Sequence, residues 1–217
     1  MATACLGASA SAASEAAEAR LRPALSPEAQ QLVAWIVRSG DNGRLPFIVV
    51  DKAGAEVLAF DRTGAPAGYA PALLGLARGD DTVPGIGQRS LASIGAEERT
   101  TPAGRFVAGI GRNLGRQDVL WIDYEAGISL HRVIRGGAED RRLQRLQTAS
   151  PHDNRISYGC INVPVAFYET VVRPAFLGGG GIVYILPEER PLHAVFPLAA
   201  GAGQTTGGHL PAMISRR

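Results

Sequence analysis

Short apolar runs separated by turn residues constrain the fold of this chain more than any other feature. Glycine (27 residues) and proline (14 residues) supply about a fifth of the 217 residues, against roughly 12% in an average protein. Apolar residues at helical spacing are sparse, so turns and short strands should dominate. The strand-like runs cover residues 47–51, 56–61, 106–110, 119–124, 128–133 and 182–187. Together they predict a mainly β fold, in which the first two runs form a hairpin.

A few helices should accompany the strands. The first begins at Ser26-Pro27-Glu28, where a capping side chain, a first-turn proline and an early acid coincide, and it should end near Gly40. A short helix is predicted over residues 138–146, where acids precede arginines. Another is predicted over residues 163–172, ended by Pro174.

One folded domain is expected over residues 26–187, because a chain of this length can bury a sizeable core. Residues 188–217 are rich in proline, glycine and threonine and are predicted to be a flexible tail. Residues 1–25 are rich in alanine and serine, and Ala8-Ser9-Ala10 resembles a signal-peptidase site, but a basic n-region and a full apolar core are missing. This segment is therefore either part of a signal peptide or a disordered linker. Cys5 is a weak lipobox candidate and is interpreted as incidental.

Charge and motif content exclude several classes of function. The formal net charge of +2 and the lack of basic runs alternating with aromatic residues argue against nucleic-acid binding. No stretch is long and apolar enough to span a bilayer as a helix. The glycine-rich region 64–99 matches no phosphate-binding motif. Asp80-Asp81 lacks further ligands at metal-binding spacing, so we expect a solvated turn and no metal site.

Cys160 is the candidate nucleophile. It follows Gly159, which leaves room for a substrate carbonyl and for backbone N–H groups aimed at an oxyanion. The alternative is that Cys160 is a small buried hydrophobic residue, as free cysteines often are. His131, in a strand-like run, and His152, in a turn, are candidate bases, and His131 is preferred because a strand positions a base better. The helix predicted over residues 163–172 would begin near the thiol and favour the thiolate.

Three separated motifs resemble the YkuD-type catalytic domain of L,D-transpeptidases, and the likeness covers roughly residues 46–187. The motifs are a histidine at a strand end, a Ser-x-Gly-Cys sequence with an apolar residue and asparagine after it, and a Thr-Pro-x-Gly-x-Phe turn. In this chain they are His131, Ser157, Gly159, Cys160, Ile161-Asn162 and residues 101–106. Two departures from the family pattern are present. Tyr158 replaces the usual second histidine, and 28 residues separate His131 from Cys160, more than is usual in the family.

The resemblance implies a β-sandwich-like core with a few short helices, and acyl transfer through a thioester without a metal or organic cofactor. Cys160 would be the nucleophile and His131 the general base. The backbone carbonyl of Arg132 would orient His131, and the N–H groups of Gly159 and Cys160 would stabilise the oxyanion. The residues expected to line the substrate site are Ser157, Tyr158, Asn162 and Arg155.

The resemblance also implies a substrate class and a location. The partners would be peptidoglycan stem peptides: the thiol attacks the amide before a terminal D-alanine, and an amine of a second stem resolves the thioester. Such an enzyme of cell-wall synthesis and cell shape acts in the periplasm or cell envelope. Arg141, Arg142 and Arg145 could pair with stem carboxylates, or could simply form an exposed basic face.

Two alternative functions remain open at this point. A hydrolase of the same fold would pass the acyl group to water, acting as an L,D-carboxypeptidase or cleaving an existing cross-link. A catalytically silent wall-binding domain is the other alternative, with Tyr158 marking decay of the site. Retention of His131 and Cys160 argues against the silent domain, while no sequence feature separates transpeptidase from hydrolase.

Overall fold

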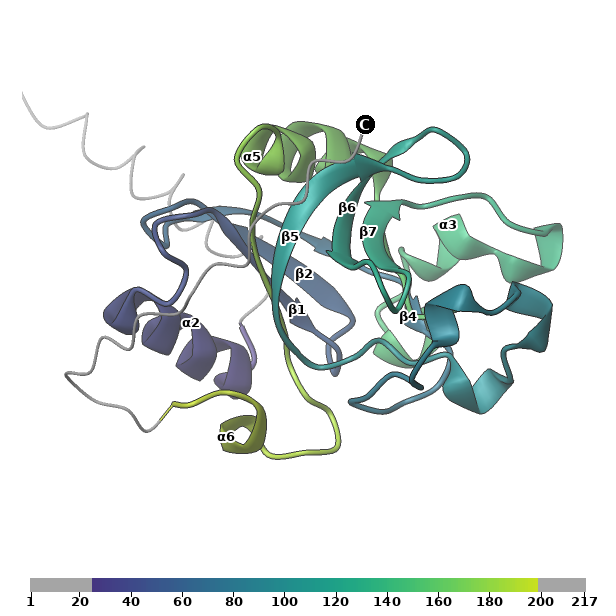
Figure 1. The fold of residues 1–217 in the computed structure, drawn as a ribbon, viewed down its shortest axis with the longest axis horizontal. Coiled ribbons are helices and arrows are strands. Elements are labelled where there is room, and N and C mark those ends of the chain that lie inside the picture. The colour runs from purple at the N-terminus through teal and green to yellow at the C-terminus, as the bar shows by residue number, and fades with distance from the viewer. Residues whose placement is uncertain (1–24, 199–217) are drawn as a thin grey trace, which may run out of the picture.

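A computed structural model describes residues 25–198 of the protein (Figure 1). Within this range an eight-stranded sheet has the order β3-β2-β1-β10-β5-β6-β7-β9, and β4 pairs separately with β8. The strands are β1 (Phe47–Asp51), β2 (Glu56–Phe60), β3 (Pro66–Pro71), β4 (Leu74–Gly75), β5 (Gly104–Arg112), β6 (Asp118–Asp123), β7 (Ile128–Arg132), β8 (Arg155–Ser157), β9 (Ile161–Val163) and β10 (Gly181–Ile185). The mainly β fold with a few short helices is thus confirmed. The signal-like segment with Cys5 and most of the predicted tail lie outside the described residues.

The helices of the described part are short apart from α2. They are α2 (Pro27–Ser39), α3 (Arg142–Arg145), α4 (Val165–Phe167), α5 (Arg173–Phe176) and α6 (Leu192–Val195), with a π-helical turn η6 (Tyr168–Val172) between α4 and α5. Short 3-10 turns occupy η1 (Ile86–Gln88), η2 (Leu91–Ser93), η3 (Ala96–Glu98), η4 (Ala138–Asp140) and η5 (Pro151–Asn154). Among residues 25–198, no helix combines the length and apolar character needed to cross a membrane.

Two apolar cores lie on the two faces of the sheet. Figure 1 shows α2 and α6 together on one side and α5 on the opposite side. Alternate residues of a strand point to opposite faces, so in β1 Phe47 and Val49 join the α2 core while Ile48 and Val50 join the other. The second core receives side chains from all eight strands of the sheet and from the helical segment after β9. The catalytic candidates lie at the β7–β9 end of this sheet.

Helix α2 follows its local sequence signals. The Ser26 hydroxyl accepts a hydrogen bond from the Ala29 N–H at 3.1 Å, and Pro27 occupies the first turn. Gly40 ends the helix in the left-handed conformation (φ 69°) and donates its N–H to the Ile36 carbonyl. The buried face includes Leu32 and Trp35, and the predicted helix with its two ends is confirmed.

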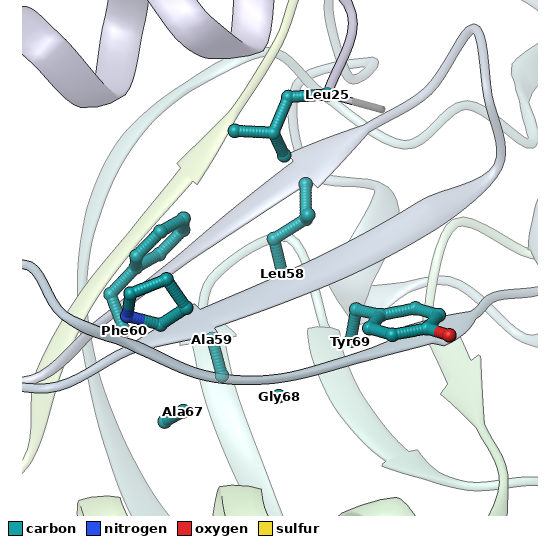
Figure 2. A pocket seen from close by; sticks show the side chains of 8 residues that line it. Leu25, Leu58, Ala59, Phe60, Ala67, Gly68 and Tyr69 are labelled. Atoms are coloured by element: carbon teal, nitrogen blue, oxygen red, sulfur yellow. The ribbon is translucent and has the colours of Figure 1, made fainter. Parts of the chain in front are cut away.

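An apolar hollow of about 280 Å³ lies over β2 and β3 (Figure 2). Its lining residues are Leu25, Leu58, Ala59, Phe60, Pro66, Ala67, Gly68 and Tyr69. Strand β3, in the glycine-rich region 64–99, forms because its backbone pairs with β2, although its sequence is poor in β-branched residues. The hollow contains neither Cys160 nor His131, and Tyr69 is the one titratable residue in its lining.

The chain after the nucleophile differs from the predicted helix over residues 163–172. Strand β9 reaches Val163, and helical structure begins at Val165 and continues beyond Pro174 to Phe176. A proline ring clashes with the carbonyl four residues earlier in a regular α-helix. The preceding π-helical turn η6 widens the helix and relieves that clash. Because β9 separates Cys160 from the helix, the helix N-terminus lies about 10 Å or more along the chain from the thiol and does not act on it.

The segment 138–146 also differs from the single predicted helix. The 3-10 turn η4 and helix α3 are separated by Arg141, which has a left-handed backbone (φ 45°). The Arg142 guanidinium pairs with Asp140 at 3.0 Å, a contact between residues two apart that do not face each other on a regular helix.

Asp80 is buried, which contradicts the predicted solvated turn at Asp80-Asp81. Asp80 is 3% exposed and Lys52 is 1% exposed, and their charged atoms lie 2.7 Å apart. The Lys52 ammonium also donates to the carbonyls of Gly79 (2.6 Å) and Thr101 (3.0 Å). Burial alone would raise the pKa of Asp80, but Lys52 and backbone N–H donors hold that pKa well below its usual range.

The fold extends past the predicted domain boundary at Pro187. The Asp80 carboxylate accepts the N–H groups of Glu188 (2.8 Å), Glu189 (3.1 Å) and Arg190 (2.7 Å). Further on, Leu192 and Phe196 are buried in the α2 core. Residues 188–198 are therefore part of the domain, because a buried carboxylate and an apolar core hold them. The sequence pattern gave no sign of this, since the carboxylate is more than 100 residues away along the chain.

We predict that Asp80→Asn lowers the free energy of unfolding by roughly 3–5 kcal/mol at pH 7, because it leaves the buried Lys52 ammonium without its counter-ion. Asp81→Asn is the matched control. The Asp81 side chain is 79% exposed, and its loss should change stability by about 0.5 kcal/mol or less. Urea denaturation measures both, and equal effects of the two substitutions would contradict the structural role of the ion pair.

The same pair predicts a dependence of stability on pH. The folded-state pKa of Asp80 is depressed, so its stabilising contribution is present above the unfolded-state pKa of about 3.9 and is lost as the pH falls below it. The difference in stability between wild type and Asp80→Asn should therefore shrink on acidification from pH 7 to pH 3. Urea titrations of both proteins at each pH check this.

Candidate active site

Parallel pairing of β7 and β9 brings the candidate base and nucleophile together. The register pairs Leu130 with Ile161 and His131 with Asn162. The same register sets Cys160, which directly precedes β9, beside Ser129 near the start of β7. Alternation along β7 places Ser129 and His131 on the same face of the strand. Two segments about 30 residues apart in sequence thus present a thiol, a hydroxyl and an imidazole at one edge of the sheet.

His131 is held by the backbone carbonyl of the next residue. Its Nδ1 lies 2.8 Å from the Arg132 oxygen. A carbonyl oxygen only accepts, so Nδ1 carries a proton and Nε2 is left to exchange a proton with a partner. Burial alone would lower the pKa of His131, but the hydrogen bond and charge of Cys160 and the Arg132 carbonyl raise it, with the nearby Arg142 guanidinium opposing them.

The Cys160 thiol lies among hydrogen-bonding groups. Its Sγ is 3.6 Å from the Ser129 hydroxyl oxygen and 3.4 Å from the Gly127 carbonyl oxygen. Burial alone would raise the pKa of the thiol, but the hydrogen bond and charge of His131 and the donors of Ser129 lower it. The opposite directions of the two pKa changes favour a thiolate–imidazolium pair, which is the reactive form of a cysteine nucleophile.

The loop before Cys160 is fixed by Ser157, which does not line an open site as predicted. Ser157 is buried; its hydroxyl donates to the Cys160 carbonyl (2.6 Å) and accepts the Gly159 N–H (3.0 Å). The Gly159 N–H is therefore occupied, and the predicted oxyanion role for it is corrected. Among residues 25–198, no acceptor engages the Cys160 N–H, so this amide is available to an oxyanion.

Gly159 is required by close packing. It has a φ of 121°, and a Cβ there would lie 2.5 Å from the Thr100 carbonyl oxygen and 2.7 Å from Ile128 Cδ1. Gly75 approaches the same stretch of backbone, since a Cβ there would lie 2.3 Å from the Arg99 carbonyl oxygen. Thr101 joins both glycines, since its hydroxyl accepts the Gly75 N–H (2.9 Å) and donates to the Gly159 carbonyl (2.8 Å). The Thr-Pro turn therefore positions the nucleophile's loop.

Asn162 is also a structural residue and not the predicted substrate contact. It is 1% exposed. Its amide nitrogen donates to the Cys160 carbonyl (3.2 Å), and its amide oxygen accepts from the Arg142 guanidinium (3.2 Å). Asn162 thus connects the nucleophile's backbone to an arginine from the segment between His131 and Cys160.

Arg155 is committed to an ion pair within the fold. Its guanidinium contacts both carboxylate oxygens of Glu188 (2.5 and 3.1 Å) and the Lys52 carbonyl (3.0 Å). Arg155 is therefore engaged within the fold, and its place in the lining of the substrate site stays a prediction. The Arg155–Glu188 ion pair is mostly buried.

Tyr158 and His152, the remaining site candidates, each contact an arginine. The Tyr158 ring is half-buried and stacks under the Arg99 guanidinium, whose central carbon is 4.0 Å from the ring centroid. His152 lies in η5 and is exposed, with Nδ1 3.3 Å from Arg78. The pKa of the Cys160 thiol is lowered by His131, and His152 is not among the groups that act on it.

Three residues of the site were not singled out for these positions from the sequence. Ser129 could have been found, because it lies two residues before His131 and shares its strand face. Thr101 was noted as part of a motif, but its bridge between Gly75 and Gly159 depends on loops that meet only in three dimensions. Arg142 was one of several arginines, and only its contact with Asn162 distinguishes it.

The arrangement supports covalent chemistry at sulfur. A thiolate with a lowered pKa can attack an electrophilic carbon, the imidazolium can return a proton to a leaving group, and a free backbone N–H can bind the oxyanion. Within the described part of the chain, no group of three or more His, Cys, Asp or Glu side chains is placed to hold a metal ion.

No model of a known protein family matches the sequence, and no curated protein matches it. Among solved structures, the fold is similar to that of Pgp2, a helical cell shape determining protein from Campylobacter jejuni, at 16% identity and a TM-score of 0.44. That match covers 72% of this chain and 55% of the Pgp2 chain, so the present chain spans little more than half of that relative.

L,D-transpeptidases are the other group of similar structures. The catalytic domain of the E. faecium L,D-transpeptidase matches at 18% identity and a TM-score of 0.36, over 64% of this chain and 95% of that domain. An L,D-transpeptidase from Mycobacterium smegmatis matches at 13% identity and a TM-score of 0.37, over 64% and 58% of the two chains. These similarities are distant, so a functional assignment depends on the geometry around Cys160.

We predict that Cys160 is alkylated by iodoacetamide at a lower pH than an ordinary thiol. The lowered pKa of Cys160 depends on His131, so His131→Ala should move the midpoint of the pH–rate profile to higher pH. His152→Ala should leave the midpoint unchanged, because His152 is exposed and pairs with Arg78. Alkylation rates between pH 5 and 10, followed by intact mass, test this, and coincident profiles for wild type and His131→Ala would refute the pairing.

Proposed function

We propose that this protein is a cysteine-dependent L,D-transpeptidase that acts on peptidoglycan stem peptides in the cell envelope. The observation that carries the proposal is that the β7–β9 pairing sets the Cys160 thiol near an imidazole whose Nδ1 is fixed at 2.8 Å by the Arg132 carbonyl and which lowers the pKa of the thiol. The motif resemblance around His131 and Cys160 supports the choice of substrate. An envelope location follows from that substrate.

The first half-reaction forms a thioester. His131 Nε2 takes the thiol proton, and the Cys160 sulfur attacks the carbonyl carbon of the amide before a terminal D-alanine. The Cys160 N–H, which has no acceptor among residues 25–198, binds the oxyanion. As the C–N bond breaks, the His131 imidazolium gives its proton to the amine of the departing D-alanine.

The second half-reaction transfers the acyl group. An amine of a second stem attacks the thioester carbonyl and gives a proton to His131, and the Cys160 thiolate leaves. His131 then returns that proton to the sulfur, so the enzyme is regenerated and a new amide links the stems. Proximity and oxyanion stabilisation supply most of the rate. If water replaces the amine, the same residues give an L,D-carboxypeptidase, and the identity of the products distinguishes the two.

The intact reactive pair favours an enzyme over a silent wall-binding domain. Tyr158, which replaces the family histidine, is not among the groups that shift the pKa of His131 or Cys160. Its ring is held by the Arg99 guanidinium. A wall-binding domain would have no need of a thiol whose pKa is lowered by an imidazole.

The test is incubation with a purified tetrapeptide stem, with and without an amine acceptor, followed by mass analysis. Wild type should release D-alanine and form a cross-linked product, and a carbapenem should add covalently to the protein. Cys160→Ala should give neither D-alanine nor adduct while keeping its circular dichroism spectrum. His131→Ala should slow acylation by about 10²-fold or more, and His152→Ala should not. A carbapenem adduct that persists in Cys160→Ala would disprove the nucleophile.

Tyr158 provides a separate prediction. Tyr158→Phe keeps the ring under Arg99, so acylation by the carbapenem should stay within about tenfold of wild type, or ~1.4 kcal/mol of barrier. Tyr158→His should also remain active. If the wild type is inert and Tyr158→His restores acylation, the result would instead support the catalytically silent domain. Acylation rates of the three proteins, measured side by side, decide between these outcomes.

A further inference from the structure

The segment between β7 and β8 forms an open basic hollow, and one of its lining residues, Arg142, contacts Asn162, two residues after the nucleophile. The hollow has a volume of about 430 Å³. Its lining residues are Arg135, Gly136, Gly137, Ala138, Arg141, Arg142, Leu143 and Gln144. Residues 134–146 contain four arginines and two acids, so this segment has a net positive charge. In Figure 1 the segment's helix α3 is drawn at the β7 end of the sheet.

The arginines of this segment differ in what they bind. Arg145 is structural, since it donates to the backbone carbonyls of Asp140 (2.7 Å) and Asp153 (2.6 Å). Arg142 has one acidic partner, Asp140, at 3.0 Å. Arg135 and Arg141 line the hollow and pair with no acid among residues 25–198. The hollow therefore holds more guanidinium groups than carboxylates, and an added anion would relieve their mutual repulsion.

Arg142 connects the hollow to the nucleophile. Its side chain is only 12% exposed, and it contacts Asn162, which in turn contacts the Cys160 carbonyl. Its charge also acts on His131, where it lowers the pKa and opposes the effect of Cys160. An anion bound by Arg142 would therefore lie next to a peptide attacked by the thiol, and it would reduce the unfavourable effect of the guanidinium on the imidazolium.

We propose that this hollow binds a carboxylate of the peptide substrate. The donors are the Arg135 and Arg141 guanidinium groups and the Nη2 group of Arg142, whose Nε and Nη1 already contact Asp140 and Asn162. A guanidinium presents paired N–H donors that match a carboxylate. The peptide part of this assignment rests on the function proposed above, whereas the anion site does not. Stem peptides offer two sources of the group, the C-terminal carboxylate of the leaving residue and a side-chain carboxylate.

The first experiment requires no peptide activity. Iodoacetate and iodoacetamide both alkylate a thiolate with loss of iodide, but only iodoacetate carries a carboxylate. The ratio of their rates at Cys160 cancels changes in thiol reactivity and reports the positive potential beside the sulfur. Arg142→Gln should lower this ratio about fivefold, and Arg141→Gln should lower it less. Arg62→Gln, which removes an exposed arginine after β2 near the opposite edge of the sheet, should leave it unchanged.

The second experiment identifies the carboxylate. The value of kcat/KM is measured for stems with free carboxylates, with a C-terminal carboxamide and with an amidated side-chain carboxylate. Arg142→Gln should cost at least about tenfold on the free stem, and the loss should disappear on the peptide that lacks the bound carboxylate. Arg142→Lys, which keeps the charge but not the paired donors, should be intermediate, and circular dichroism checks the fold of each variant.

The outcomes separate the two proposals. An alkylation ratio that is the same in wild type, Arg142→Gln and Arg141→Gln overturns the anion site. If Arg142→Gln lowers kcat/KM equally on all three peptides, the assignment of Arg142 to a substrate carboxylate is overturned. If Arg142→Gln lowers the alkylation ratio but the wild type processes no stem peptide, the anion site is supported and the transpeptidase function is refuted.

Discussion

The buried ion pair between Lys52 and Asp80 is the interaction on which the arrangement of the loops depends. The Lys52 ammonium donates to three acceptors in two segments of the chain. The Asp80 carboxylate accepts three consecutive backbone N–H groups, those of residues 188–190. A buried pair adds little net stability compared with apolar packing, but loss of one partner is costly because the other charge remains without water. The pair therefore specifies which segments meet: the β1–β2 turn, residues 79–80, Thr101 and the chain after β10.

The ion pair reaches the nucleophile through Thr101. The Thr101 carbonyl accepts from Lys52, and its hydroxyl bridges Gly75 and Gly159. The two glycines let three backbones approach more closely than any side chain would permit. The loop that carries Cys160 is thus held by packed backbone and buried hydrogen bonds, as a preorganised site requires. The cost of this precision is that the Gly159 N–H and the Ser157 hydroxyl serve the loop and not the substrate.

Charge near the sulfur is balanced between groups from different elements. His131 from β7 lowers the pKa of Cys160, and Cys160 raises the pKa of His131. Arg142, from the segment that joins them, acts against the imidazolium. A bound substrate carboxylate would offset the positive charge of Arg142 and so stabilise the His131 imidazolium. One guanidinium would then couple substrate recognition to activation of the Cys160 thiol.

The sequence by itself determined the elements whose signals are local. Turn residues and apolar spacing predict the caps of α2, the β1–β2 hairpin and the strands around His131. The Gly-Cys pair with an upstream histidine was sufficient to select Cys160 and His131 as candidates. Only the tertiary structure decided what each buried polar group contacts. Asp80 became the anchor of the C-terminal segment, Arg155 paired with Glu188, Asn162 bridged Arg142 to Cys160, and the Gly159 N–H was taken by Ser157. The physical reason is that apolar periodicity records which face of an element is buried, whereas the partner of a buried charge or amide is set by chain segments far apart in sequence that meet only when the sheet has formed.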